Sequence, residues 1–452
     1  MYASWLKGRR RAPTFPPGNS GFSLMTLANI ANRWSIAACA VLGVSSLAVA
    51  DPGDHIRIGD ATITPSLDVG LEYRTNPLRL EANSVPGVNM RIAPRVEMTL
   101  ESQEVDVRLG GDYQLIKFFS QRLTNLDRFN QFNVDAGIDV LKDQVIGFRF
   151  SDVVGIDSNP SGDQTGSYHT QFRNRFDGAS VIRVGPTLAF TLGGYYRVDS
   201  YRVPEVFDDT GRLRAFNFRD SYGPTWSADW TFFPRTAVVY YGSYDIQRWG
   251  ATCISTGNTV QALGSSLALP DNNHLKMQAG LRGRITERMT VVVTGGYGSG
   301  RYLEDSVDGC ADSRRDAYAQ DVKGIDNLLV TAQIQYDFGV GQRVAVGYRK
   351  DFLDSWFTNY TAFNELYGTY TGRLGSRFGL SSGVRMRFEN HFGQESRADI
   401  RLQANGDLTY YFQDYASVTA GAAWIQRATS DVVDQSLEFD AVNIHLLGTF
   451  TY

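Results

Sequence analysis

The chain has 452 residues, a formal net charge of −4 and only three cysteines, which excludes a disulfide scaffold and a nucleic-acid binder that works through a strongly basic surface. Hydrophobic residues make up 42% of the chain, which excludes a disordered protein. The 45 glycines, 26 phenylalanines and 23 tyrosines favour many strands and turns over helices.

The N-terminal segment predicts export from the cytoplasm. Residues 34–50 carry no charge, follow Arg33 and end in Ala48-Val49-Ala50. A basic flank, a short apolar core and a small-x-small end are typical of a secretory signal peptide. We therefore expect residues 1–50 to be an N-terminal extension and signal peptide cleaved after Ala50, and 51–61 to be a short periplasmic N-terminus. A membrane helix is the alternative, but the apolar run is short for a stable span.

From residue 62 to the C-terminus, apolar and polar residues alternate with period two. One run has Ile92, Pro94, Val96, Met98 and Leu100 on one face and a mostly polar set on the other. Most runs reach the roughly 9–11 residues that a tilted strand needs to cross a bilayer. They predict 18 strands, at 62–73, 90–101, 105–119, 128–140, 145–156, 168–184, 187–199, 214–232, 236–248, 273–285, 289–300, 326–338, 343–352, 358–374, 378–389, 398–411, 415–426 and 438–452.

The connections between these strands alternate in length, with eight short turns among nine longer loops. Outer-membrane barrels show this asymmetry, with short periplasmic turns and long extracellular loops. The expected fold is therefore all-β: a single transmembrane antiparallel β-barrel of 18 strands over residues 62–452. A soluble β-propeller or a pair of sandwiches is the alternative, but strands of that kind bury both faces and show a fixed-period repeat.

The last predicted strand carries apolar residues on one face from Val442 to Tyr452, and the chain stops on that aromatic. This looks like the assembly signal of bacterial outer-membrane barrels. It implies the bacterial outer membrane as the location. It also implies outer-membrane lipid and the barrel assembly machinery as partners, and no nucleic acid.

The polar faces are expected to line the lumen, because a charge on the lipid face costs roughly 2–4 kcal/mol near the midplane. A charged bore of this width has to hold water. The alternative is that the same side chains form ion-pair ladders that brace the wall, and both interpretations stay open. The candidate lumen-lining residues are Arg91, Arg95, Glu97, Arg108, Asp112, Asp135, Arg149, Arg173, Arg175, Arg282, Arg284, Arg385, Arg387, Asp399 and Arg401.

Arginine predominates on two adjacent predicted strands: Arg173, Arg175 and Arg183 share one face of one strand, and Arg149 lies on the strand before. Such a cluster either attracts an anionic solute or pairs with Asp177 and Asp139 on the same expected face. We favour pairing, because both acids lie within the predicted lumen.

The candidate reactive groups are two cysteines and the histidines. Cys253 and Cys310 fall in the two longest predicted loops, and an oxidising compartment favours a disulfide between them, with two free thiols as the alternative. No P-loop, dinucleotide fingerprint or zinc spacing occurs, and no histidine has a nucleophile placed beside it. We therefore expect no enzyme, no cofactor and no metal site.

The first strands carry a family resemblance. The first runs from Ile63 to Tyr73 and continues into Arg74-Thr75-Asn76-Pro77, and the second contains Pro94. A turn then leads to Gly111-Asp112-Tyr113. A first strand that ends in Tyr-x-x-Asn-Pro, followed by a strand with an internal proline, resembles the β-barrel porin type 2 family.

Members of that family often accompany bacterial exopolysaccharide synthesis and export. The resemblance implies an outer-membrane porin-like channel that lets a secreted exopolysaccharide cross the membrane. It further implies a periplasmic polysaccharide-export protein as a partner and the polysaccharide as cargo, and it assigns no substrate contact. Two alternatives stay open: a general or sugar-selective diffusion porin, and a structural or adhesive barrel.

Overall fold

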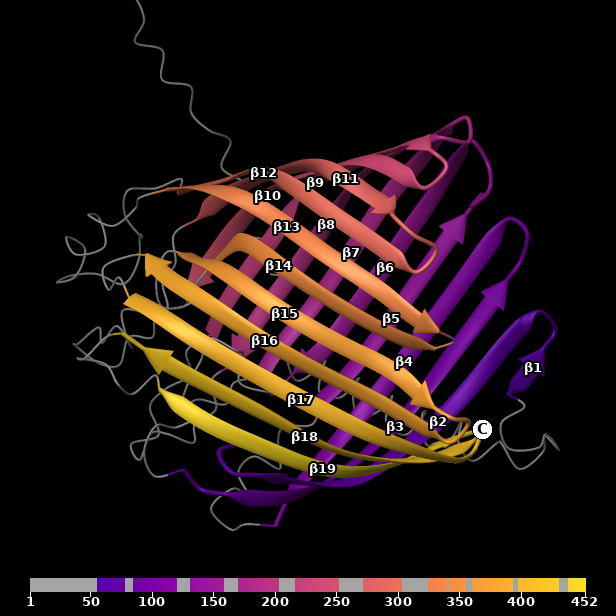
Figure 1. The fold of residues 1–452 in the computed structure, drawn as a ribbon, viewed down its shortest axis with the longest axis vertical. Helices are drawn as coiled ribbons and strands as arrows, with labels where there is room; N and C mark the ends of the chain where they lie inside the picture. Colours follow the sequence, from indigo (N-terminus) through magenta and orange to yellow (C-terminus); the bar gives the residue numbers. More distant parts are fainter. Residues whose placement is uncertain are drawn as a thin grey trace, which may run out of the picture. The chain divides into compact units, whose positions relative to one another are not determined.

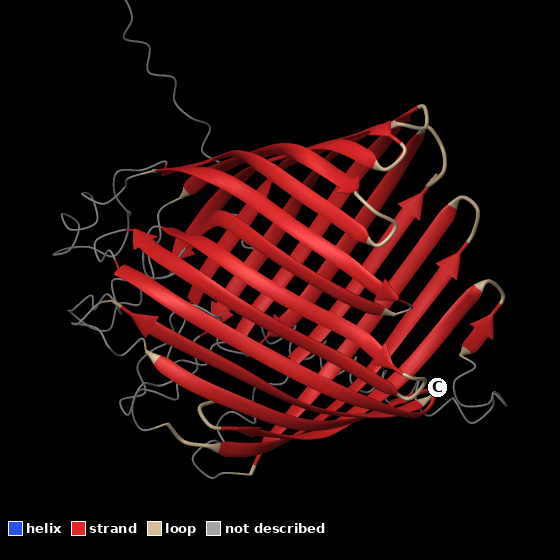
Figure 2. Ribbon diagram, viewed as in Figure 1, coloured by secondary structure: helices blue, strands red, loops and turns tan. Residues whose placement is uncertain are grey.

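A computed structural model of the chain describes residues 55–77, 84–119, 131–157, 170–202, 216–251, 271–302, 324–339, 341–354, 360–392, 397–430 and 438–452. Every regular element in these segments is a β-strand (Figure 2). None of them contains a helix long and apolar enough to cross a membrane. The expected signal peptide, its cleavage site after Ala50, and both Cys253 and Cys310 lie outside the described residues.

Eighteen strands follow one another round the sheet in chain order (Figure 1). They are β2 (Ala61–Arg74), β3 (Gly87–Glu101), β4 (Val105–Phe118), β5 (Gln131–Val140), β6 (Ile146–Asp157), β7 (Thr170–Val184), β8 (Leu188–Arg202), β9 (Phe216–Phe233), β10 (Thr236–Ala251), β11 (Asn272–Arg284), β12 (Met289–Tyr302), β13 (Ile325–Gly339), β14 (Gln342–Asp354), β15 (Tyr360–Leu374), β16 (Phe378–Phe392), β17 (Arg397–Gln413), β18 (Ala416–Thr429) and β19 (Phe439–Thr451).

The sheet closes on itself. Each strand from β2 to β18 pairs antiparallel with the next one along the chain, and β19 pairs with β2. This closing register runs from Asn443 opposite Arg74 to Thr451 opposite Ser66. The fold is therefore a closed, all-β antiparallel barrel of 18 strands, which confirms the fold class predicted from the alternation.

The short turns explain why sequential strands are neighbours. Connections of two to five residues are too short for a parallel crossover, so each strand returns antiparallel beside the strand before it. Three of these turns use glycine in the left-handed region: Gly185 with φ of 67°, Gly341 with φ of 75° and Gly375 with φ of 70°. A side chain at any of these positions would strain the turn.

A short strand precedes the barrel wall. β1 (Ile56–Ile58) pairs with Ala61–Ile63 of β2, whereas β19 begins to pair with β2 only at Ser66. β3 pairs with the other edge of β2 over its whole length. β1 and β19 therefore lie one after the other along the same edge of β2. The alternation does not predict β1, since three residues are too few to show a period.

The two faces of the closed sheet differ in chemistry. The Tyr195 hydroxyl of β8 donates to Asp245 of β10 at 2.9 Å, and Lys276 of β11 donates to Asp351 of β14 at 2.7 Å. Side chains that reach over one or two intervening strands in this way meet on the concave side of a curved sheet. The opposite face carries large exposed hydrophobic side chains, such as Val384 at 63% exposure. The polar set therefore faces inward at these positions and the apolar set faces outward.

Candidate functional site

Asp199 of β8 is fully buried and forms the centre of one charge cluster, the Asp199 cluster. Arg173 of β7 and Arg219 of β9 stand directly opposite it in the two neighbouring strands. Their guanidinium groups lie 3.4 and 2.6 Å from its carboxylate, and that of Arg197, two residues earlier on β8, lies 2.7 Å away. Alternation places residues 197 and 199 on one face. Three guanidinium groups therefore share this carboxylate.

Asp399 of β17 has similar surroundings and forms the Asp399 cluster. Arg397, two residues earlier on β17, donates from Nε to Asp399 Oδ2 at 3.2 Å, and Arg427 of β18 donates from Nε to the same oxygen at 3.0 Å. His391 Nε2 of β16 lies 2.9 Å from that oxygen. The side chains of all four residues are at most 4% exposed. This carboxylate is therefore held from three strands in a place that bulk water does not reach.

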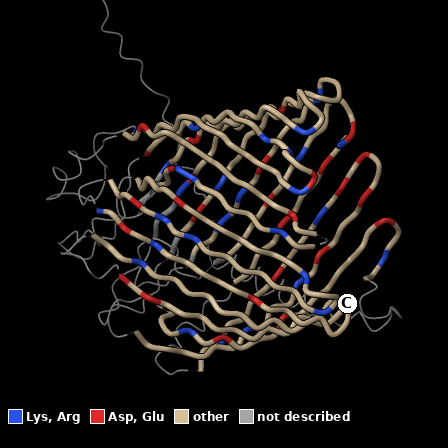
Figure 3. The backbone as a smooth tube through the Cα atoms, in the orientation of Figure 1, with Lys and Arg blue, Asp and Glu red and all other residues tan. Residues whose placement is uncertain are grey.

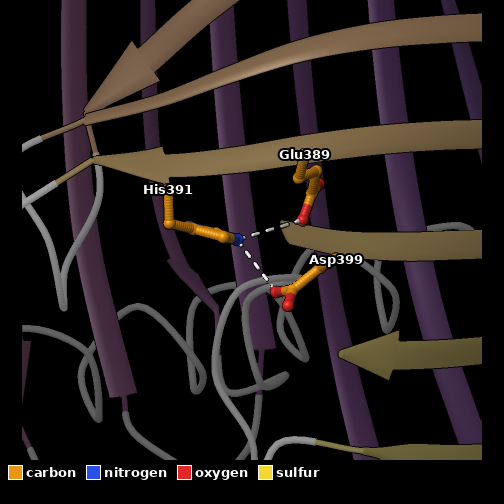
Figure 4. Close-up of side chains that lie close together, drawn as sticks. All are labelled: Glu389, His391 and Asp399. Carbon is orange, nitrogen blue, oxygen red and sulfur yellow. Dashed lines mark ion pairs between the residues drawn. The ribbon is translucent and has the colours of Figure 1, made fainter. Parts of the chain in front are cut away.

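Glu389, His391 and Asp399 bring three potential metal ligands within 4.8 Å of one another (Figure 4). However, Glu389 also contacts Arg387 at 3.5 Å and Arg401 at 3.3 Å. A metal cation here would compete with these guanidinium groups for the same oxygens and would be repelled by them. The donor set therefore fits an ion-pair network better than a metal centre.

The network continues along the inner face toward β14. Glu365 of β15 contacts Arg387 at 2.6 Å and Arg385 at 3.6 Å. Asp351 of β14 contacts Arg349 at 2.5 Å in addition to its lysine partner from β11. Both carboxylates are at most 7% exposed, whereas Arg385 and Arg349 keep 49% and 46% of their side-chain surface exposed.

The register of β16, β17 and β18 places like charges directly opposite one another. Arg387, Arg401 and Arg427 stand in one row, each opposite the next, and Glu389 stands opposite Asp399 in the adjacent row. Like charges directly opposite one another destabilise a sheet. The ion pairs therefore run diagonally between the rows, so removal of an acid leaves facing arginines behind.

Positions of both charge signs are spread over many strands of the barrel (Figure 3). The predicted lumen-lining residues fall into exposed pairs, members of the buried networks and others. The exposed pairs are Arg95 with Glu97 (3.5 Å), Arg149 with Asp139 (2.8 Å), Arg175 with Asp177 (2.8 Å) and Arg282 with Asp229 (2.8 Å). The network members are Arg173, Arg385, Arg387, Asp399 and Arg401. The others are Arg91, Arg108, Asp112, Asp135 and Arg284, on β3, β4, β5 and β11.

The arginine-rich strand β7 pairs only partly as predicted. Arg175 pairs with Asp177, but Arg173 pairs with Asp199. Arg183 donates to the main-chain carbonyl of Gln144 at 3.1 Å. The difference arises because β8 supplies a carboxylate directly opposite Arg173, which alternation within β7 does not reveal.

Sequence reasoning did not select Arg197, Asp199, Arg219, Arg397 or Arg427 as site residues. Alternation shows which face a side chain lies on, but it does not show which residue stands opposite on the next strand. The Arg-x-Asp triplet is a usable signal: it lies near the end of β8, before residues 203–215, and at the start of β17, after residues 393–396. In both places the triplet marks the centre of a cluster.

The Tyr-x-x-Asn-Pro motif lies where the barrel closes. Asn76 is 4% exposed, and its Nδ2 donates to the main-chain carbonyl of Asp440 at 3.2 Å. The main-chain N–H of Thr75 donates to the carbonyl of Val442 at 2.9 Å. The motif therefore fastens the end of β2 to β19, a structural role that assigns no cargo.

No protein family and no curated protein matches this sequence. Among solved structures, the chain is similar to the FrpB iron transporter from Neisseria meningitidis, at 8% identity and a TM-score of 0.47 over 89% of this chain and 83% of that one. It is also similar to the outer membrane protein OpdK from Pseudomonas aeruginosa (13%, 0.43, 86% and 99%) and to OccAB3 from Acinetobacter baumannii (11%, 0.45, 87% and 100%). Identities and TM-scores this low do not indicate what this protein transports.

Proposed function

We propose that this protein is a bacterial outer-membrane channel through which small hydrophilic solutes diffuse. The observation that supports it best is the division of a closed sheet into an apolar outside and a charged inside. Exposed leucines occur on strands around the ring, among them Leu71 on β2, Leu192 on β8, Leu281 on β11 and Leu446 on β19. Soluble proteins rarely expose so much contiguous apolar surface, whereas lipid requires it.

The charged inner face points to water rather than to a dry core. Arg149, Arg175 and Arg282 keep 64%, 44% and 48% of their side-chain surface exposed even though each is in an ion pair. Guanidinium groups in a dry interior would each cost several kcal/mol. Barrels of 16 to 18 strands are wide enough to leave an aqueous passage. A solute that keeps its hydration shell could then cross without meeting lipid.

Electrical recording tests this proposal. The purified, folded protein, added to a planar lipid bilayer in potassium chloride, is expected to raise the current in discrete steps. The same protein unfolded by heat is the control for detergent artefacts. Protein that inserts in its folded form but carries no current would contradict the proposal.

Passage of a secreted exopolysaccharide is a second candidate, favoured by the resemblance of the first strands to the β-barrel porin type 2 family. Deletion of the gene separates the two. A diffusion channel predicts slower solute uptake with normal extracellular polysaccharide, and an export channel predicts the reverse. If both stay normal, a structural or adhesive barrel is favoured instead. An export channel would also be expected to co-purify with a periplasmic polysaccharide-export protein.

A further inference from the structure

We propose that the Asp199 and Asp399 clusters, together with the adjoining charges on β14–β16, form two facing halves of one binding region for anionic solutes. The inference rests on the proposed channel function and names its solute class. Asp199 lies on β8 and Asp399 on β17, nine strands apart in a closed ring of eighteen. Nine strands are half the circumference of such a ring, so the two clusters face each other across the bore.

Both clusters lie close to the end of the barrel where the long loops join. Asp199 is three residues from the end of β8 at Arg202, and Arg173 is three residues from the start of β7 at Thr170. Asp399 is two residues from the start of β17, and Arg427 is two residues from the end of β18. Because strands rise by about 3.3 Å per residue, the two clusters lie at a similar depth below the rim.

Among the residues that the structure describes, each half holds more cations than carboxylates. Around Asp199, three guanidinium groups face one carboxylate, and the nearby Asp245, which accepts from Tyr195, lowers that excess by one. On the opposite wall the carboxylates are Asp351, Glu365, Glu389 and Asp399. Seven cations contact them: Lys276 and the arginines at positions 349, 385, 387, 397, 401 and 427. The described residues therefore leave positive charge on both sides of the bore.

The exposed cations are the ones able to meet a solute. Arg173, Arg349 and Arg385 are 46%, 46% and 49% exposed, and each contacts a carboxylate that is at most 7% exposed. That carboxylate also contacts a second cation that is less exposed, such as Lys276 at 22% for Asp351. The less exposed cation satisfies most of the carboxylate charge, so the more exposed guanidinium keeps a positive potential directed at the bore.

Guanidinium chemistry selects the solute class. Its planar fork of donors matches the paired oxygens of a carboxylate or a phosphate, and it has no such match in a neutral sugar. The inferred solute is therefore a small carboxylate or phosphate compound. This differs from a uniformly charged wall, which would slow all anions equally along its length.

Block of the single-channel current tests the inference, with citrate, inorganic phosphate and neutral sucrose as probes. Citrate and phosphate are expected to reduce the wild-type current in a saturable way, and sucrose only through viscosity. Arg173→Gln, Arg349→Gln and Arg385→Gln should each raise the half-blocking concentration of citrate about fivefold, the factor given by about 1 kcal/mol of attraction. Arg385→Lys keeps the charge and should restore most of the block.

Arg282→Gln is the matched control, because Arg282 is equally exposed at 48% but pairs one to one with Asp229 near the short-turn end of β11. Its half-blocking concentration should change by less than about twofold. Equal citrate block in the wild type and in all of these variants would overturn the inference while leaving the channel intact. A protein that carries no current at all would instead overturn the proposed function.

Discussion

Asp199 and Asp399 occupy matching positions half-way round the barrel from each other, each with an arginine two residues earlier on its own strand. Each also contacts cationic or ionisable side chains from both neighbouring strands. The interior charges are thus gathered into buried centres near the long-loop end. Toward the short-turn end, pairs such as Arg149 with Asp139 are exposed and stand one to one. The two ends of the bore therefore differ in both charge density and burial.

Asp399→Asn is expected to destabilise the barrel strongly. The change keeps the shape of the side chain but removes the negative charge between the buried Arg397 and Arg427. Removing one partner of a buried ion pair costs about 3–5 kcal/mol. The temperature at which the detergent-folded barrel loses its fast-migrating gel band should fall clearly.

Asp139→Asn is the control for this change. It breaks a pair with Arg149 in which the two side chains are 39% and 64% exposed, and such pairs contribute roughly 0–1 kcal/mol. A similar fall in both variants would mean that burial of the Asp399 cluster has no energetic consequence.

Asn76→Ala is expected to weaken the closure of the barrel between β2 and β19. The variant loses the hydrogen bond from the buried Asn76 side chain to the main-chain carbonyl of the exposed Asp440, and such a bond contributes about 0.5–1.5 kcal/mol. Hydrogen exchange of the Thr75 and Val442 amides should become faster. Asn133→Ala, which removes an exposed bond to Asp112, should leave those amides unchanged. Unchanged exchange in both variants would contradict the structural role of the motif.

Val384→Arg and Gln403→Arg test which face of the wall meets lipid. Val384 stands opposite Ala404 with its side chain outward, and Gln403, the residue before Ala404, lies on the inner face. An arginine on the lipid side costs roughly 2–4 kcal/mol near the midplane. Gln403→Arg instead places an arginine in water opposite Arg385, where the repulsion costs less, roughly 0.2–1 kcal/mol. The folded fraction in lipid vesicles should therefore fall much further for Val384→Arg than for Gln403→Arg. A fall confined to Gln403→Arg would mean that the face of Gln403, and not the face of Val384, meets lipid.

The disulfide between Cys253 and Cys310 stays a prediction, since both residues lie outside the described segments. Reduction of the folded protein should add the mass of two hydrogens and make both thiols reactive. Labelling of either cysteine in the untreated protein would show that the two are free.

The strands were predictable because alternation repeats in many segments that agree on one architecture. The differences concentrate at the long-loop ends, where some observed strands run further than predicted and others, such as β5 and β7, begin later. β16 ends at Phe392 rather than at residue 389, and β18 ends at Thr429 rather than at 426. Polar side chains such as His391 and Arg427 occupy these extensions, so the apolar alternation disappears although main-chain pairing continues.

The site was less predictable, because its geometry depends on the register between strands. Across a short turn the register can be counted: from the turn at residues 414–415, the pairing brings Arg401 opposite Arg427. Across a long loop it cannot, and Arg219 reaches Asp199 only after residues 203–215. The contact of Asp199 with Arg219 therefore became visible only with the closed sheet, whereas Arg173 lies across a short turn and Arg197 on the same strand.

The most direct test of the channel is the conductance of the folded wild-type protein in a planar lipid bilayer, recorded with and without citrate. We expect stepwise currents that citrate reduces in a saturable way. Folded protein that inserts into the bilayer without carrying current would contradict the proposed function.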